Sequence, residues 1–357
     1  MHLLGARART AVLPSARRSA GRGGLVAFAL VCSLAVAGCS GGGSTPAAKQ
    51  TPTPTPSPSA QSTAAGAVLS GRWPLTGLPA SGTVPRHPVM IVKIDNTLSS
   101  RPQIGLKHAD MVSEELVEGG STRLAVFYYS DVPKLVGPVR SFRATDIGIV
   151  KPEKAALVAS GGAPPTVRRM ADAHIKTYTE GAPGFFRDNS RPAPYNLFMH
   201  LRVLARHLKS RGRPADYLPW GSAHDLPSGQ PAKRLAAVFS GGHTTTWKYQ
   251  NGHYVNLDSN AAKGDRFVPD TVLVLRVHEG NAGYLDPAGN PVPEADFTGH
   301  GDAMVFHGGR VVRAEWVKNG LNATVGLRTS SGKLALPPGH VWIELVPSNG
   351  GSVQITK

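Results

Sequence analysis

Short apolar runs separated by turn residues dominate the chain from residue 71 onward. Residues 89–94 (VMIVKI) are rich in β-branched side chains, which predicts a buried strand. Residues 111–117 and 122–129 are two further strand-like runs, and the Glu-Gly-Gly segment between them predicts a hairpin. Residues 155–159 predict a short strand that leads into a Ser-Gly-Gly turn.

Helical spacing is clear at only two places. Residues 165–173 predict a helix that has proline in its first turn, where the missing N–H costs nothing. Residues 197–209 predict a longer helix, because four leucines recur at the spacing of one helical face. These leucines are Leu197, Leu201, Leu204 and Leu208.

The pattern changes after about residue 211. Residues 212–235 hold Pro-, Gly- and Ser-marked turns and predict a connecting segment. Residues 236–357 predict a β-rich domain, because Asn-Gly and Gly-Gly pairs join alternating runs into hairpins. The predicted strands are residues 244–249, 254–258, 271–278, 303–307, 311–317 and 341–346. Whether this half is a separate domain or completes the sheet of residues 71–211 stays open at this level.

The first 70 residues differ in charge from the rest of the chain. They carry six of the 39 basic residues and none of the 23 acidic ones, so part of the overall charge of +16 belongs to a leader. Five arginines precede a thirteen-residue apolar run at residues 25–37. That run is too short to span a bilayer, which needs about 20 residues, and it is typical of a secretory signal. Residues 1–38 are therefore predicted to be a signal peptide.

The signal segment ends in Val36-Ala37-Gly38-Cys39, a sequence similar to the lipobox of bacterial lipoproteins. We expect Cys39 to carry a diacylglyceryl anchor that holds the protein at the extracytoplasmic face of the cell membrane. Residues 40–70 consist mainly of Ser, Thr, Ala, Gly and Pro, so they predict a disordered tether after the lipidated cysteine. Thr-Pro repeats in this tether also suit O-glycosylation.

The residues after 70 contain no cysteine, because both cysteines, Cys32 and Cys39, lie in the leader. This excludes disulfides, Cys-ligated metal and a thiol nucleophile from the folded part. Phosphate-loop, dinucleotide, zinc-protease and serine-hydrolase motifs are absent as well. His200 and His207 lie two turns apart on the predicted helix and do not make a metal site by themselves. We therefore expect no cofactor and no metal.

Several ordered segments resemble the YerB-like lipoproteins, a bacterial family with a domain of unknown function. The matching segments are residues 74–78 (PLTGL), 89–96 (VMIVKIDN), 101–103 (RPQ), 109–112 (ADMV), 116–120 (LVEGG), 137–141 (GPVRS), 187–188 (RD), Arg191, 193–197 (APYNL), 316–318 (WVK) and 338–343 (PGHVWI). The resemblance implies an α+β fold, with a mixed-sheet αβ domain at residues 71–211 and the β-rich domain at 236–357. A layered sheet–helix–sheet order is one arrangement compatible with it. Tyr195 departs from the family pattern, in which we expect histidine.

Arginines in loops are the most informative candidates for a site. Guanidinium groups bind carboxylate or phosphate in a bidentate manner, which suits recognition of an anionic polymer. The alternative is that these arginines form ion pairs inside the fold with Asp95, Glu114, Glu115, Glu118 and Asp188. The predicted ligand-binding residues are Arg140, Arg143, Arg187, Arg191 and Asn196.

Three carboxylates are the candidates for acid–base chemistry: Asp95, Glu115 and Asp188. Asp95 follows a buried strand, where ligand groups often lie, but a turn capped by its own side chain explains it equally. A hydrolase would need two carboxylates facing one groove.

Two classes of function remain. The first is a non-catalytic lipoprotein that binds an anionic cell-wall polymer or an envelope protein, and the second is a cell-wall hydrolase or transferase. The absence of known catalytic motifs favours the first class, the binding lipoprotein. A secreted chain does not meet genomic DNA, so we expect no nucleic-acid partner.

Overall fold

The computed structural model describes residues 71–80, 82–210 and 212–357. The predicted signal peptide 1–38, the lipidation site Cys39 and the tether 40–70 lie outside the described residues. Within the described ranges, no helix has the length and apolar character needed to cross a membrane.

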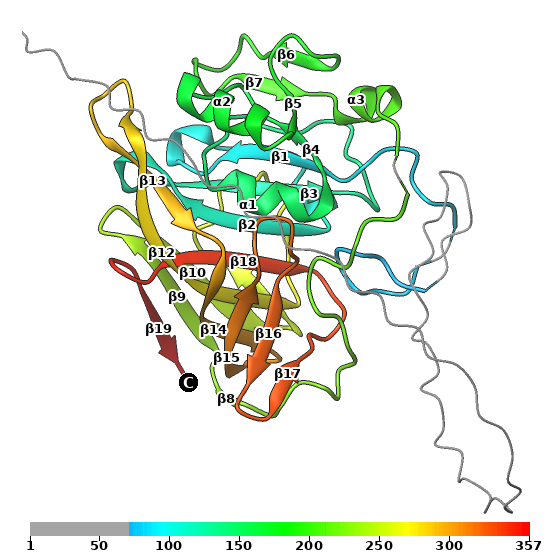
Figure 1. Ribbon diagram of the computed structural model, residues 1–357, viewed down its shortest axis with the longest axis vertical. Helices are drawn as coiled ribbons and strands as arrows, with labels where there is room; N and C mark the ends of the chain where they lie inside the picture. The colour runs from blue at the N-terminus through cyan, green and yellow to red at the C-terminus, as the bar shows by residue number, and fades with distance from the viewer. Residues whose placement is uncertain (1–70, 81, 211) are drawn as a thin grey trace, which may run out of the picture. The chain divides into compact units, whose positions relative to one another are not determined.

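A mixed sheet of thirteen strands runs through the described part of the chain (Figure 1). Two of the strands lie off the main path: β13 (Pro291–Asp296) pairs with β12, and β8 (Gln230–Pro231) pairs with β15. The main path runs in the order β17 (Gly332–Leu334), β16 (Gly326–Thr329), β15 (Arg310–Lys318), β14 (Gly299–His307), β12 (Thr271–Leu285), β18 (Val341–Pro347), β2 (Met111–Leu116), β3 (Thr122–Tyr128), β1 (Met90–Asp95), β4 (Ala156–Val158) and β5 (Lys176–Tyr178).

The two halves of the chain meet in the middle of this sheet. Strand β18, near the C-terminus, lies between β12 and β2 and is parallel to both. In this register Glu344 of β18 lies opposite Glu114 of β2. Backbone hydrogen bonds therefore continue from one half to the other, and the C-terminal half completes the sheet that the N-terminal half begins.

A second sheet of four strands packs against one face of the large sheet. Trp247 of the small sheet and Trp342 of β18 meet edge to face, with ring centroids 5.0 Å apart. Because these buried rings are in direct contact, no helix separates the two sheets at this point. The small sheet has the order β11 (His253–Asn256), β10 (His243–Gln250), β9 (Arg234–Ser240) and β19 (Ser352–Thr356).

Short helices cover the rest of the large sheet. Ile147 of α1 (Asp146–Val150) and Met170 of α2 (Pro164–Asp172) belong to the apolar core on the face away from the small sheet. Leu204 of α3 (Leu201–His207) belongs to the core on the other face. The suggested sheet–helix–sheet order is thus not confirmed. The short 3₁₀ helices are η1 (Leu98–Ser100), η2 (Leu106–His108), η3 (Glu118–Gly120) and η4 (Lys151–Glu153).

The predicted helix over residues 197–209 is wrong at its N-terminal end. Leu197–Met199 forms strand β7, which pairs with β6 (Phe185–Arg187). The Val139 N–H donates to the carbonyl of Leu197 at 2.7 Å, and the Met199 N–H donates to Val136 at 3.0 Å. These distant partners decide the backbone conformation, because the leucine spacing suits a buried strand followed by a helix as well as one long helix.

Candidate functional site

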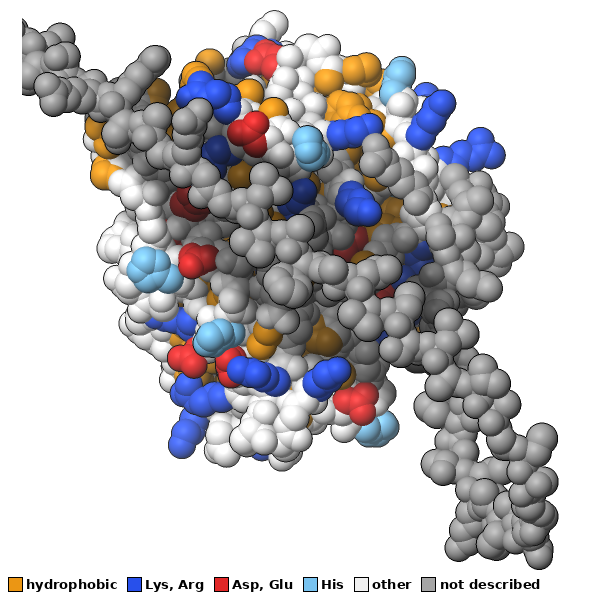
Figure 2. All heavy atoms as spheres, viewed as in Figure 1, with side chains coloured by type: hydrophobic (Ala, Val, Ile, Leu, Met, Phe, Trp, Pro, Cys, Tyr) orange, Lys and Arg blue, Asp and Glu red, His pale blue; other side chains and the backbone are white. Residues whose placement is uncertain are grey.

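The carboxyl ends of several strands meet at one edge of the large sheet. Strands β1 and β4 are parallel, and β2 has the same direction because both β1 and β2 are antiparallel to β3. In sheets of this kind, ligand groups gather at the carboxyl ends of the strands. Five charged residues at this edge form what we call the carboxyl-edge cluster: Asp95, Glu118, Arg123, Arg140 and Arg143. Figure 2 shows that basic and acidic side chains are also mixed over much of the face that it draws.

Asp95 ends β1 and has two structural roles. Its Oδ1 accepts hydrogen bonds from the backbone N–H and the hydroxyl of Thr97, at 2.8 and 2.5 Å. This is the turn capped by its own side chain that the sequence offered as an alternative. Its Oδ2 accepts a hydrogen bond from Nε of Arg140 at 2.8 Å. Asp95 therefore fixes both the turn and the position of the Arg140 guanidinium.

Glu118 follows β2 and accepts from two arginines. Arg143 donates from Nε to Oε2 at 2.7 Å and from Nη2 to Oε1, which makes a bidentate pair. Arg123 donates to Oε1 from the other side at 3.5 Å. Burial raises the pKa of Glu118, but the bond from Arg143 and the two arginine charges outweigh it and lower the pKa to about 2. Glu118 is thus a permanent anion that neutralises part of the arginine charge.

Arg140 differs from the other arginines of the cluster. Its side chain is 23% exposed, and its guanidinium lies over the ring of Tyr195, 5.5 Å from the centroid. Within the described residues, neither Nη atom of Arg140 donates a hydrogen bond, since only Nε is used. Tyr195 therefore provides an aromatic surface for a guanidinium that retains four N–H donors.

The structure gives the remaining predicted ligand residues separate partners. Arg187 forms a bidentate pair with Glu180, at 2.6 Å for both contacts, and donates from Nη1 to Oδ1 of Asn196 at 2.7 Å. Arg191 donates to two backbone carbonyls at 3.1 Å and lies over the ring of Phe198. Arg187 and Asn196 are thus brought together, while Arg143 and Arg191 have partners of their own.

The other two predicted acid–base candidates lie in contrasting places. Glu115 is buried beneath α1, where Nζ of Lys93 lies 2.5 Å from it and 2.8 Å from Asp146. Burial and the negative charge of Asp146 raise the pKa of Glu115 to about 7, although Lys93 opposes the rise. Asp188 caps an exposed turn by accepting from the N–H and hydroxyl of Ser190. Among the described residues, the side chains of Asp95, Glu115 and Asp188 thus have different partners.

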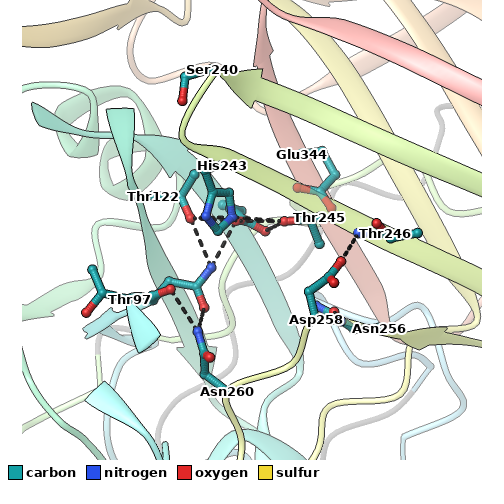
Figure 3. A network of polar contacts seen from close by, with 12 residues as sticks. Thr97, Thr122, Ser240, His243, Thr245, Thr246, Asn256, Asp258, Asn260 and Glu344 are labelled. Carbon is teal, nitrogen blue, oxygen red and sulfur yellow. Dashed lines mark hydrogen bonds and ion pairs between the residues drawn. The ribbon is translucent and has the colours of Figure 1, made fainter. Parts of the chain in front are cut away.

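A polar network on the opposite face of the sheet was not predicted from the sequence (Figure 3). At its centre Glu114 accepts from the hydroxyl of Thr122 at 2.6 Å and from that of Thr245 at 3.0 Å, and Nε2 of His243 lies 2.8 Å away. Glu344 lies beside this group and accepts from the indole N–H of Trp247 at 2.6 Å. The network joins β2, β3, β10 and β18, and it is almost entirely buried.

Sequence reasoning missed Arg123 of the carboxyl-edge cluster and Glu344 and His243 of the buried network. Arg123 and Glu344 each interrupt an apolar strand run, and a charge inside such a run is the one local signal that could have identified them. His243 stands in an ordinary alternating strand, so nothing nearby in the sequence indicates its pairing with Glu114.

Metal-binding arrangements are absent from the described ranges. In residues 71–357, leaving aside positions 81 and 211, no three His, Cys, Asp or Glu side chains come together as a ligand set.

Comparison with known proteins places the chain in a family. Residues 75–214 match the family described as protein of unknown function (DUF3048), N-terminal domain, and residues 235–343 match its C-terminal domain. The chain belongs to this family, which confirms the resemblance to the YerB-like lipoproteins.

YerB of Bacillus subtilis matches most of the chain in both sequence and structure. A Bacillus subtilis (strain 168) protein named "Putative lipoprotein YerB" is 26% identical over 290 residues, which cover 77% of this chain and 86% of the relative. The crystal structure of the YerB protein from Bacillus subtilis matches with a TM-score of 0.65 at 21% identity, covering 79% of this chain and 99% of that one. The structural likeness establishes a shared fold.

Proposed function

We propose that this protein is an extracytoplasmic binding lipoprotein that recognises an anionic group of the cell envelope at its carboxyl-edge cluster. The lipoprotein name of the relative and the lipobox at Cys39 support the membrane anchor. The position of the cluster, at the edge where parallel strands present ligand groups, supports the binding role.

The state of Arg140 is the observation that carries the proposal. Asp95 and Tyr195 hold its guanidinium in place, and its two Nη atoms have no partner within the described residues. A carboxylate or phosphate would accept two parallel hydrogen bonds from such a fork. Because the side chain is already ordered, little conformational entropy would be lost when the anion binds.

The charge of the cluster also favours an anion. It contains three arginines and two carboxylates, so one positive charge is unbalanced. Burial, and to a smaller extent the positive charges of Arg143 and Arg140, lower the pKa of Arg123 to about 10. A bound anion would relieve the repulsion between these charges. Two serines offer further hydrogen-bond donors. Ser141 follows Arg140 in the chain, Ser160 lies just after β4, and their hydroxyl oxygens are 3.1 Å apart.

The alternative, a hydrolase or transferase, draws no support from its three candidate carboxylates. Asp95 is bound to Arg140, Glu115 is buried against Lys93, and Asp188 caps an exposed turn. A general acid and its partner would have to face one open groove.

The proposal is tested by the response of Arg140→Gln to anionic polymers. We expect a poly(glycerol phosphate) or a polyuronate to raise the melting temperature of the full-length protein, because a ligand that binds only the native state stabilises it. Arg140→Gln should abolish the shift, and Arg140→Lys should retain only part of it because lysine lacks the fork.

Arg328→Gln is the matched control for the loss of one arginine. Arg328 is exposed and pairs with Glu315, so its replacement removes one charge and one surface ion pair away from the cluster. If Arg140→Gln and Arg328→Gln reduce the shift equally, binding depends on overall charge and the proposed site is wrong.

A further inference from the structure

A pocket lies at the edge of the large sheet opposite the carboxyl-edge cluster. It has a volume of about 820 Å³ and is formed where β4 and β5 begin, beside the C-terminal end of α3. Its polar lining consists of lysines, histidines and neutral side chains, with no Asp or Glu among the lining residues. The basic side chains are Lys151, Lys154, His174, Lys176, His207 and Lys209. We call this feature the lysine pocket.

The charge of the lysine pocket is uncompensated. Among the described residues, no carboxylate lies within ion-pairing distance of any of the four lysines. Lys151 donates one hydrogen bond to the carbonyl of Ala173 at 2.8 Å, which leaves two of its three protons for other acceptors. On the face drawn in Figure 2, Lys, Arg and His side chains gather over α3, at the upper right, with no acidic side chain among them. Charges of one sign collected in a hollow attract and concentrate counter-ions.

The backbone at two of these positions is in the left-handed region. Lys154 has φ of 49° and His174 has φ of 55°, and among the described residues only Asn251 is another non-glycine with positive φ. Glycine would adopt this conformation without the steric cost that a Cβ brings. Lys154 is the C-cap of η4 and His174 directly follows the C-cap of α2, so two helix ends bring basic side chains to one pocket.

We propose that the lysine pocket binds a phosphate ester that carries more than one negative charge. Several ammonium groups act as point charges around the hollow. Such an arrangement suits a phosphate with several negative charges, whereas a single carboxylate is matched best by the planar fork of an arginine. The pocket is large enough for a group beyond the phosphate, and Tyr178 with Ala155 and Ala156 gives it a partly apolar wall. The esterified group would lie against that wall.

This inference does not depend on the proposed function. The carboxyl-edge cluster lies where β1 and β4 end, whereas the lysine pocket lies where β4 and β5 begin. The length of the strands separates the two sites, so variants of one leave the side chains of the other unchanged.

The first experiment titrates the full chain with inorganic pyrophosphate and follows binding by calorimetry. We expect Lys154→Gln/Lys176→Gln to weaken the affinity roughly tenfold or more, because each removed charge contributes a fraction of the binding energy. The matched control is Lys263→Gln/Lys333→Gln, which removes two exposed lysines outside the pocket. Arg140→Gln should bind pyrophosphate like the wild type, which separates this test from the previous one.

The source of the phosphate is decided with vesicles. Phosphatidylcholine vesicles with or without phosphatidic acid are mixed with the full chain carrying Cys39→Ala, and sedimentation measures binding. Binding that requires phosphatidic acid and the pocket lysines assigns a lipid headgroup, whereas pyrophosphate binding alone assigns a soluble or polymeric phosphate. Equal loss in the pocket and control variants, or no pyrophosphate binding by the wild type, would overturn the proposal.

A substitution of Lys154 by glycine separates binding from folding. Lys154→Gly removes the charge and also relieves the left-handed backbone at this position. We expect its melting temperature to equal or exceed that of the wild type while its pyrophosphate affinity falls. A variant that melts at the wild-type temperature or above and binds pyrophosphate as well as the wild type would show that Lys154 does not contact the anion.

Discussion

The imidazole of His243 lies 2.8 Å from the carboxylate of Glu114, and this contact joins the small sheet to the large one. Burial raises the pKa of Glu114, but the bond and charge of His243 and the hydroxyls of Thr122 and Thr245 outweigh it, so the pKa is lowered. Burial lowers the pKa of His243, but Glu114 reverses this and the pKa is raised. Both shifts indicate a charged pair in the folded protein.

His243→Gln should therefore destabilise the protein in a pH-dependent way. The stabilisation by His243 is complete below its ordinary pKa of 6.5 and is lost as the pH rises through the higher folded-state pKa. That from Glu114 is present above 4.5 and is lost as the pH falls through its lowered folded-state pKa. Between pH 4.5 and 6.5 we expect His243→Gln to lower the free energy of unfolding by about 2 kcal/mol. This loss should become smaller above pH 6.5.

Urea unfolding at a series of pH values measures this difference. His253→Gln is the control, because His253 also contacts an aspartate but is about half exposed. A difference between His243→Gln and wild type that stays constant from pH 5 to about 9 would contradict a charged pair.

Glu344 should tolerate replacement by glutamine. Burial and the adjacent Glu114 raise the pKa of Glu344 well above its ordinary 4.5, so the carboxyl is held protonated. An acid of this kind stabilises the fold below pH 4.5, and that contribution is lost as the pH rises towards its folded-state pKa. Glu344→Gln keeps an oxygen to accept from Trp247 and cannot ionise. Its unfolding free energy should exceed that of the wild type at alkaline pH, whereas Glu114→Gln should lower it; thermal melts at pH 6 to about 9 compare the two.

Lys93→Met should be severely destabilising, because Lys93 is fully buried and neutralises both Glu115 and Asp146. Leaving two buried carboxylates without their cation costs about 3–5 kcal/mol in the free energy of unfolding. Adding Glu115→Gln to Lys93→Met removes one of them and should restore part of the loss. Chemical unfolding of both single variants and the double variant measures this coupling, and a loss in the double variant equal to the sum of the two single losses would show that the two side chains do not interact.

Cys39→Ala should abolish lipid attachment, because the thiol is the predicted acceptor of the diacylglyceryl group. Metabolic labelling with a fatty-acid probe, followed by fractionation of membrane and soluble protein, measures the effect. Cys32→Ala is the control, since Cys32 lies inside the predicted apolar run. Equal labelling of Cys39→Ala and wild type would rule out Cys39 as the lipidation site.

The strands of the fold were more predictable from the sequence than their pairing. Apolar runs such as residues 89–94 carry the signal for a buried strand within themselves, and β1 lies at Met90–Asp95. The pairing of β18 with β2 joins residues more than two hundred positions apart, and no local pattern encodes such a contact. The same limit explains β7, whose partners lie in other segments of the chain.

The candidate site was predictable in its residue types and only partly in its contacts. The pairing of arginines with Asp95 and Glu118 was one of the two alternatives offered by the sequence, and the structure shows it for Arg140 and Arg143. Glu180, the partner of Arg187, was not anticipated, because it lies in a turn without any strand pattern. Whether Arg140 binds an anion stays a prediction.

The insertion of β18 beside β2 has a consequence for how the protein is made. Residues 341–347 are synthesised late, so one edge of β2 stays unpaired until these residues are available. Exposed edges recruit other strands, and pairings between distant segments form slowly. A chain that stops before residue 341 would leave this edge permanently open. Incomplete copies of this protein would therefore be prone to pair with other chains through β2, an edge that residues 341–347 close in the folded protein.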